Sequence, residues 1–441
     1  MIKLTNTLTG QKEELIPSGK DGLTFYACGI TPSGFAHLGH GRCYVLFDVL
    51  YRFLKSQNQK VTYCRNITDI DDKLLQKAED LGDRHRYQDV AETYLNAFFE
   101  DMESLNCLFP DHQPRATEVI PDIIHFIEIL IKKGHAYAVE GDVYFDVQSS
   151  PEYGKLSKRN LDDLKAGARV EINTKKKNPT DFALWKSEPQ GEFWNSPWGF
   201  GRPGWHIECS VMATKFLGNT IDIHSGGMDL IFPHHENEIA QSEGVTGVPF
   251  VKNWMHVAFV RIEKEKMSKS TGNFYTLRDV FDTFDPMVVR FYILKHHYRS
   301  PMDFSMADLE AAEKAYRKLC KAFNVSEECK IDMSLACSLK TPVMCKMINF
   351  VQDDLNTVGM WGIVFENLDT LGDELCTVKA FIQNVLGLSL DPLPEKIICI
   401  TPEIQTIIEE REKARAEKKW EKADMLRDKL KELGYDAQDT K

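Results

Sequence analysis

The chain has 441 residues, 43% hydrophobic and 27% charged, which allows two or three globular domains. No apolar run reaches the roughly 18–20 residues of a membrane span, and the polar N-terminus lacks the apolar stretch of a signal peptide. The net charge of −12 argues against general nucleic-acid binding, yet residues 155–186 carry nine Lys or Arg against four Asp or Glu. The eleven cysteines lack framework spacing, so we expect reduced thiols and a cytoplasmic protein.

A strand, a helix and a second strand are predicted in the N-terminal region. "LTFYACGI" (23–30) and "KVTYCRNI" (60–67) are rich in β-forming residues, and between them apolar residues recur with helical spacing at positions 45, 46, 49, 50, 53 and 54. This order is typical of a βαβ unit in a parallel sheet. Ligands of such sheets bind beyond the carboxyl ends of the strands, so "CGITPSGFAHLGH" is expected to line the binding crevice.

The motif "HLGH" stands at the predicted start of this helix. A helix N-terminus attracts anions through its free N–H groups. His37 and His40, one turn apart, can add donors for a phosphate, and Gly39 lets a flat ring approach the backbone. The chain has no P-loop and no G-x-G-x-x-G after this strand, and "HLGH" alone is a weak motif that ordinary helix-cap histidines would also explain.

A second cationic motif, "KMSKSTGN", lies far along the chain at 266–273. Lys266 and Lys269 stand three residues apart among serines and a glycine. Such a loop can close on a polyphosphate and relax afterwards, which predicts a partner for the "HLGH" motif.

Residues 233–238 read "PHHENE" and suggest a metal site. The metalloprotease signature H-E-x-x-H fails because an isoleucine stands where the second histidine is required. The leading proline suits the first turn of a helix, on which His234 and Glu238 are four apart and share a face. His235 is three residues from Glu238 and pairs less naturally. Periodicity therefore favours His234 with Glu238, and leaves His235 and Glu236 to support this pair or to face solvent.

Longer stretches carry a family resemblance. "HLGH" and "KMSKS" are the two signatures of class I aminoacyl-tRNA synthetases. The chain also contains, in order, "YACGITPSGFAHLGHGR", "NITDIDDK", "GRPGWHIECSVM", "HSGGMDLIFPHHENEIAQSE" and "ADMLRDKL". With these motifs it resembles the cysteinyl-tRNA synthetases over residues 1 to about 435.

The resemblance implies a zinc site with the ligands Cys28, Cys209, His234 and Glu238. Cysteine and serine differ by one atom, and an apolar or hydrogen-bonding pocket separates near-isosteres weakly. Zn²⁺ binds a thiolate and lowers the pKa of the thiol, whereas a hydroxyl is a poor ligand. One zinc ion per subunit is therefore expected to select the substrate side chain.

The same resemblance implies residues that bind the cysteine substrate. Trp205 is expected to form the aromatic wall of the pocket, and Asp229 to hold the substrate amine. Gly29, Thr68 and His224 are expected to make further contacts in the same cleft.

The implied reaction has two steps. The carboxylate of L-cysteine attacks the α-phosphate of ATP, and the terminal ribose of tRNA(Cys) then takes the cysteinyl group from the adenylate. No protein nucleophile is needed, so catalysis rests on positioning and charge stabilisation. His37 and His40, with Gly39, are expected to hold the phosphates of Mg²⁺-bound ATP, and Lys266 and Lys269 the departing pyrophosphate.

The predicted fold is α/β, with a Rossmann-like parallel-sheet catalytic domain over 1–305. A connective insertion at about 85–220 interrupts the sheet and, in the family, meets the tRNA acceptor end; the "KMSKS" loop spans 266–270. An α-helical bundle is expected over 306–400, opened by a capping box at Ser305. A short helical region of the anticodon-binding type follows at 401–441, with one helix to about 417 and another from 420.

Two rival functions remain open. One is a cysteine ligase that acylates an amino sugar, as in mycothiol biosynthesis, but such enzymes lack the anticodon-type helices. The other is a non-catalytic paralogue, which should have lost a signature or zinc residue, and none is missing. We expect a monomer, because no apolar heptad suggests an interface between subunits. We also expect no contact with membranes.

Overall fold

The computed structural model describes residues 2–159, 174–262, 265–266, 274–324, 341–394 and 402–432. Within these residues the chain forms two compact units, Met1–Asp391 and Pro392–Lys441. None of the helices among them has the length and apolar character that a bilayer crossing needs.

A four-stranded parallel sheet lies at the centre of the first unit. Its strands, in spatial order, are β11 (Val251–Val257), β10 (Ile221–Gly227), β3 (Leu23–Ile30) and β4 (Val61–Ile67). The predicted strands 23–30 and 60–67 are thus confirmed as neighbours. Because all four strands run in the same direction, their carboxyl ends meet along one edge, where ligands bind in sheets of this kind.

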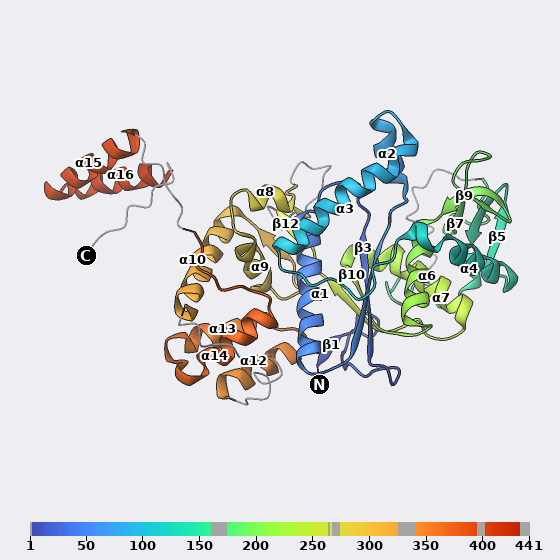
Figure 1. The fold of residues 1–441 in the computed structure, drawn as a ribbon, viewed down its shortest axis with the longest axis horizontal. Coiled ribbons are helices and arrows are strands. Elements are labelled where there is room, and N and C mark those ends of the chain that lie inside the picture. Colours follow the sequence, from blue (N-terminus) through green and yellow to red (C-terminus); the bar gives the residue numbers. More distant parts are fainter. Residues whose placement is uncertain are drawn as a thin grey trace. The chain divides into compact units, whose positions relative to one another are not determined.

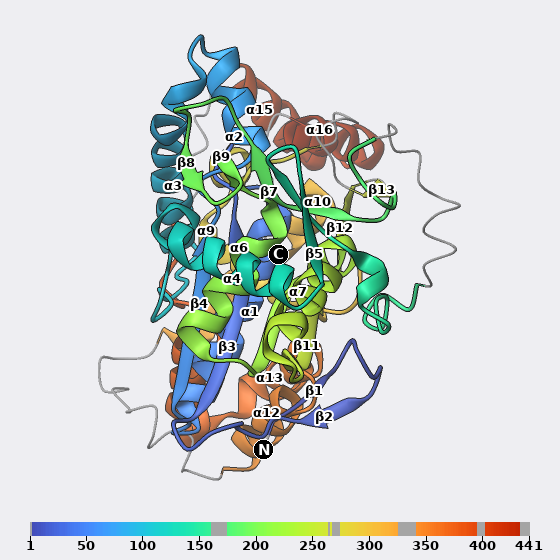
Figure 2. The same cartoon turned by 90° about the vertical axis from the view of Figure 1, so that its right-hand side faces the viewer.

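Helices cover both faces of this sheet. Helix α1 (Leu38–Ser56) lies on one face, and α6 (Trp205–Leu217) and α7 (Glu236–Thr246) lie on the other (Figures 1 and 2). The apolar stripe of α1 is buried as the periodicity predicts, with Val45, Leu46, Val49 and Leu50 fully covered. A short hairpin of β1 (Lys3–Thr5) and β2 (Lys12–Glu14) precedes the sheet.

The expected insertion contains a separate antiparallel sheet. Its spatial order is β5 (Ala136–Val139), β6 (Asp142–Phe145), β7 (Phe182–Ser187), β9 (Gly199–Pro203) and β8 (Trp194–Ser196). The helices before this sheet are α2 (Asp72–Asp80), α3 (Tyr87–Ser104) and α4 (Ile120–Lys132). Helix α6, inside the expected bounds of the insertion, packs against the parallel sheet, so the insertion shares its core with the catalytic part.

A small three-stranded sheet follows the parallel sheet. It consists of β13 (Glu265–Lys266), β12 (Val260–Ile262) and β14 (Met302–Phe304), with α8 (Leu277–Phe281) and α9 (Pro286–Leu294) between β13 and β14. Strand β12 continues almost directly from β11, so this sheet begins at the carboxyl edge of the parallel sheet.

Helices make up the rest of the first unit. They are α10 (Met306–Phe323), α12 (Pro342–Gln352), α13 (Thr357–Asn367) and α14 (Leu375–Asn384). Ser305 caps this helix as predicted, since its hydroxyl accepts from the Asp308 backbone N–H at 3.1 Å, but the predicted box is incomplete because the Asp308 carboxylate accepts from the Ser305 hydroxyl and not from its backbone N–H. The sheet and these helices belong to the same compact unit.

The second unit contains a helical hairpin. Helix α15 (Pro402–Ala416) and α16 (Trp420–Glu432) bury Ile404, Ile407, Leu426 and Leu430 between them. Both helices begin where the sequence predicts, α15 at Pro402 and α16 at Trp420.

The cysteines are mostly free thiols. Seven described cysteines are unpaired, Cys28 and Cys209 among them. Cys376 is disulfide-bonded, so the expectation of reduced thiols throughout the chain is wrong at this position.

Candidate active site and metal centre

Four buried side chains that the sequence singled out meet at the carboxyl edge of the parallel sheet. Cys28 comes from β3, Cys209 from α6, Glu238 from α7 and His234 from the turn before α7. Their ligand atoms all lie within 4.8 Å of one another. Cys28 is 7% exposed and the other three 2% or less, so this is a closed cluster of soft and hard donors.

The turn before α7 differs from the predicted helix. Helix α7 begins at Glu236, and residues Ile231–His235 form one wide turn with extended backbone at Phe232. Phe232 is the one residue of this turn with non-helical backbone, so Pro233 stands in the first turn that leads into α7, as expected, although that turn is wider than in a regular α-helix. The predicted pairing of His234 with Glu238 is present, because His234 Nε2 lies 3.0 Å from Glu238 Oε1.

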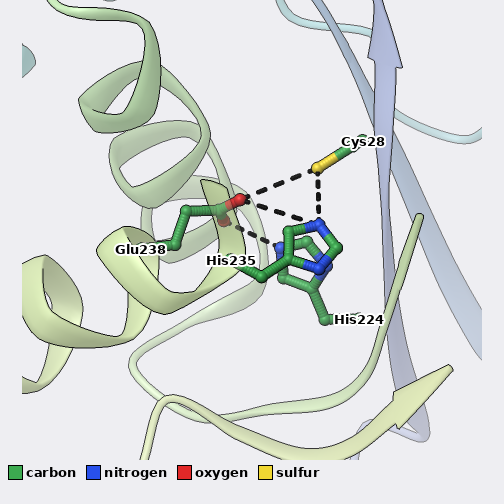
Figure 3. A group of neighbouring side chains, drawn as sticks. All are labelled: Cys28, His224, His235 and Glu238. Atoms are coloured by element: carbon green, nitrogen blue, oxygen red, sulfur yellow. Dashed lines mark hydrogen bonds and ion pairs between the residues drawn. The ribbon is translucent and has the colours of Figure 1, made fainter. Parts of the chain in front are cut away.

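A second set of four residues overlaps the first. It consists of Cys28, His224, His235 and Glu238, and its ligand atoms also lie within 4.8 Å of one another (Figure 3). His235 Nε2 is 3.2 Å from Cys28 Sγ, and His224 Nε2 is 2.8 Å from Glu238 Oε2. Glu238 thus lies between the two sets, with Oε1 toward His234 and Oε2 toward His224.

The charges favour the set that contains Cys209. A hydrogen bond from the Cys28 thiol lowers the pKa of Cys209 to about 6 against the opposing effect of burial, and His234 contributes in the same direction. Burial raises the pKa of Cys28, which keeps its proton. The pKa of Glu238 falls to about 2, since His224 and His234 outweigh its burial. Cys209 and Glu238 are therefore both anionic near neutral pH.

His234 supplies the positive charge between these anions. Burial alone would lower its pKa, but Glu238 and Cys209 more than offset that and raise it to about 10. The proton on His234 supplies positive charge next to the Cys209 thiolate and the Glu238 carboxylate, and a bound divalent cation could supply that charge instead. Two cysteines, one imidazole and one carboxylate are a donor set that zinc accepts, so the residues fit a zinc ion.

The two other residues of "PHHENE" are buried. His235 is 0% and Glu236 1% exposed, so the alternative that they face solvent is wrong. Glu236 accepts the backbone N–H groups of Leu156 and Ser157 and ties α7 to the insertion. His235 Nδ1 lies 2.8 Å from His256 Nε2, which orients its ring.

A cavity of about 500 Å³ connects the metal cluster to the phosphate motif. Cys28, Trp205 and Asp229 border it near the cluster, and His37 and His40 border it at the start of α1. Residues of the "HLGH" signature thus share one cavity with Cys28 of the candidate metal centre. The space suits two reactants that meet between these ends.

The "HLGH" motif forms the N-cap of α1. The Nδ1 atom of His37 accepts from the His40 backbone N–H at 3.3 Å, and Nδ1 of His40 accepts from the His37 backbone N–H at 3.2 Å. The rings stack with centroids 3.7 Å apart. Since both Nδ1 atoms are acceptors, a neutral ring carries its proton on Nε2, where it can donate to a bound phosphate. Gly39, between them, also borders the cavity.

The second signature motif is described only in part. Lys266 lies in β13 and pairs with Arg261 of β12 in the antiparallel register. Lys269 lies outside the described residues. Phe274 borders the cavity with its ring 5.4 Å from that of His37, and Thr276 forms a β-bridge with His37. The first described residues after the motif therefore lie beside the start of α1.

The residues expected to bind cysteine do not all border the cavity. The Trp205 ring, 37% exposed, lies 4.3 Å from the ring of His234. Gly29 also borders the cavity, and its N–H donates to Asn66 Oδ1 at 2.8 Å. Thr68 and His224 are buried and are not among the lining residues, so their contacts to a substrate stay predictions.

Sequence reasoning missed three side chains at this site. His206 Nδ1 lies 2.8 Å from His234 Nδ1, and His256 contacts His235. His256 is near the carboxyl end of β11, and the general rule for parallel sheets could have identified it. Lys73 borders the cavity from α2, and no spacing pattern pointed to it.

Comparisons with known proteins agree with this geometry. A family model for the class I (C) tRNA synthetase catalytic domain matches residues 15–314, and one for the cysteinyl-tRNA ligase anticodon-binding domain matches residues 400–441. A cysteine–tRNA ligase of Trichlorobacter lovleyi is 43% identical over 470 residues, covering 97% of this chain and 96% of that protein. One of Methylococcus capsulatus is 44% identical over 469 residues, covering 100% and 98%.

Solved structures share the fold at low sequence identity. A methionyl-tRNA synthetase of Mycobacterium tuberculosis in complex with methionyl-adenylate superposes with a TM-score of 0.59 at 13% identity, over 83% of this chain and 92% of that one. A LeuRS of Agrobacterium radiobacter in a ternary complex superposes with 0.57 at 12% identity, over 86% and 85%. The predicted α/β fold is confirmed, and the chain belongs to the cysteine–tRNA ligase family of class I tRNA synthetases.

Proposed function

We propose that the protein ligates L-cysteine to tRNA(Cys) in two steps, with cysteinyl adenylate as the intermediate. The observation that carries this proposal is the single cavity that joins a buried thiol-rich cluster to the histidine-capped start of α1. The first feature suits a thiol substrate and the second suits the phosphates of ATP. The relatives that carry the name cysteine–tRNA ligase cover nearly the whole chain.

Zinc, one ion per subunit, is the proposed cofactor. Cys28, Cys209, His234 and Glu238 would hold it, and when bound it would supply a soft Lewis acid that prefers a thiolate to a hydroxyl. The chain itself supports this choice because Trp205 borders the same end of the cavity with its ring against His234. A serine in the same position would bring only a poor ligand.

The first step depends on positioned charges of the chain. Asp229 is proposed to hold the substrate amine, which leaves the carboxylate free to attack the α-phosphate of Mg²⁺-bound ATP. The Nε2–H groups of His37 and His40 donate to the phosphates, and Lys266 and Lys269 bind the departing pyrophosphate. The terminal ribose hydroxyl of tRNA(Cys) then takes the cysteinyl group, with AMP as the leaving group.

The working state proposed for the protein is a cytoplasmic monomer. The seven free thiols of the described residues suit a reducing compartment. Gel filtration coupled to light scattering should give a mass near 50.5 kDa.

Three assays test the proposed activity together. Cysteine should drive ATP–pyrophosphate exchange, serine should not, and tRNA(Cys) should become charged. An amino sugar that is acylated in place of tRNA would instead identify the amino-sugar ligase. A protein without cysteine-dependent exchange would be a non-catalytic paralogue.

A further inference from the structure

Lys73 of α2 borders the cavity of the candidate active site. Among the described residues that line this cavity, Lys73 is the only lysine or arginine and Asp229 is the only carboxylate. It is the second residue of α2 and its side chain is exposed. No ion pair of its ammonium group with any described side chain is present. We propose that Lys73 is a phosphate-binding residue of the cavity.

The start of α2 is held firmly, which fixes the base of the Lys73 side chain. Asp71 caps the helix by accepting the Lys73 backbone N–H at 2.8 Å. Asp72 forms ion pairs with Lys186 of β7 and with Arg202 of β9, the latter at 2.6 Å. The Asp72 carboxylate therefore points to the inserted sheet, while Lys73, the next residue, borders the cavity. The backbone of Lys73 is thus fixed where α2 meets the inserted sheet, and the residue borders the cavity.

The charges of the residues that line the cavity indicate what Lys73 can bind. His37 and His40 offer neutral N–H donors because their Nδ1 atoms accept backbone N–H groups. Two of the three reactants, ATP and the tRNA, carry phosphate, and a full positive charge bordering a partly apolar cavity binds phosphate more strongly than a neutral donor does. Lys73 supplies this charge from α2, a different element from the strand β13 that contains Lys266.

Two phosphates of the proposed reaction can reach such a position. One is the α-phosphate of ATP, which stays in the adenylate. The other is the phosphodiester that precedes the terminal ribose of the tRNA. The inference rests on the proposed function, and the two halves of the reaction distinguish these sources.

Three variants test the inference. Lys73→Met removes the charge, Lys73→Arg keeps it, and Lys77→Met makes the same change one turn further along α2, at a residue that does not line the cavity. Cysteine-dependent ATP–pyrophosphate exchange reports the first step. Single-turnover transfer from preformed adenylate to tRNA(Cys) reports the second, and thermal unfolding monitors the fold of each variant.

We expect Lys73→Met to slow one of the two steps by about 10- to 100-fold, as for a lost charged hydrogen bond. Slower exchange with a raised KM for ATP identifies the α-phosphate, and slower transfer with normal exchange identifies the tRNA phosphodiester. Lys73→Arg should recover most of the rate, and Lys77→Met should match the wild type.

The inference is overturned if Lys73→Met matches the wild type in both steps, or if only the KM for cysteine rises, since that would indicate carboxylate binding. An equal loss in Lys77→Met would also overturn it, because the effect would then belong to the surface charge of α2. A wild-type protein without cysteine-dependent exchange would contradict the proposed function itself.

Discussion

His234 Nε2 lies 3.0 Å from Glu238 Oε1, although His234 belongs to a wide turn and Glu238 to the helix that follows. The same carboxylate contacts His224 through Oε2 at 2.8 Å. Glu238 and Cys28 are thus shared by two possible metal sites. The first also contains Cys209 and His234, and the second contains His224 and His235.

Replacement of the two adjacent histidines should separate these sites. We expect His234→Ala to lose bound zinc and to raise the KM for cysteine by at least about 100-fold, because it removes a ligand. His235→Gln is the matched variant, and it should retain zinc. Elemental analysis of the purified variants measures the zinc content. Retention by His234→Ala together with loss by His235→Gln would assign the metal to the second set.

Removal of the metal should affect the two substrates differently. A chelator is expected to abolish cysteine binding and to leave ATP binding intact, since the phosphate site at the start of α1 contains no ligand of the cluster. Calorimetric titrations of the stripped protein measure both affinities, and added zinc should restore cysteine binding. Equal loss of both affinities would show that the cluster maintains the fold and does not select the thiol.

A change of His37 to Asn separates helix capping from phosphate binding. Asparagine is a good N-cap residue, so the free energy of unfolding should change by less than about 0.5 kcal/mol. The variant lacks the Nε2–H donor, and exchange should fall by about 100-fold, as for a lost oxyanion donor. Urea unfolding and pyrophosphate exchange provide the two readouts. A fall in exchange that only follows a fall in stability would rule out the donor role.

Arg42 should matter for the stability of the active-site edge. This fully buried guanidinium donates to the carbonyl oxygens of Ala258, Phe259, His297 and Ser300. Burial lowers the pKa of Arg42 to about 10, which leaves it charged at neutral pH. Arg42→Met strands these carbonyl groups, and we expect a loss of about 3 kcal/mol in the free energy of unfolding. Arg299→Met, at a half-exposed arginine, is the control, and equal losses would contradict this role.

The local patterns of the sequence predicted the N-terminal part of the fold well. The strand at 23–30 and the stripe of α1 depend on neighbours a few residues away, so periodicity is sufficient to find them. The His37–His40 cap was predictable for the same reason. The wide turn before α7 was not predicted from helical spacing, although the extended backbone of Phe232 is the conformation that a following proline favours.

The remainder of the site could not be derived from spacing. Cys28 and Cys209 are far apart in the chain and meet only because helix α6 packs against strand β3, so the family resemblance alone indicated them. His256 and Lys73 reach the site from β11 and α2 through the same topology. His224 was expected at the cleft, and it lies buried behind Glu238.

The direct test of the thiol-selecting site is X-ray absorption at the zinc edge of the purified protein, with and without cysteine. Ligation by Cys28, Cys209, His234 and Glu238 predicts two sulfur neighbours at about 2.3 Å and a third when cysteine binds. A single sulfur neighbour would place the metal with His224 and His235. A sulfur count that cysteine leaves unchanged would contradict selection of the substrate by its thiolate.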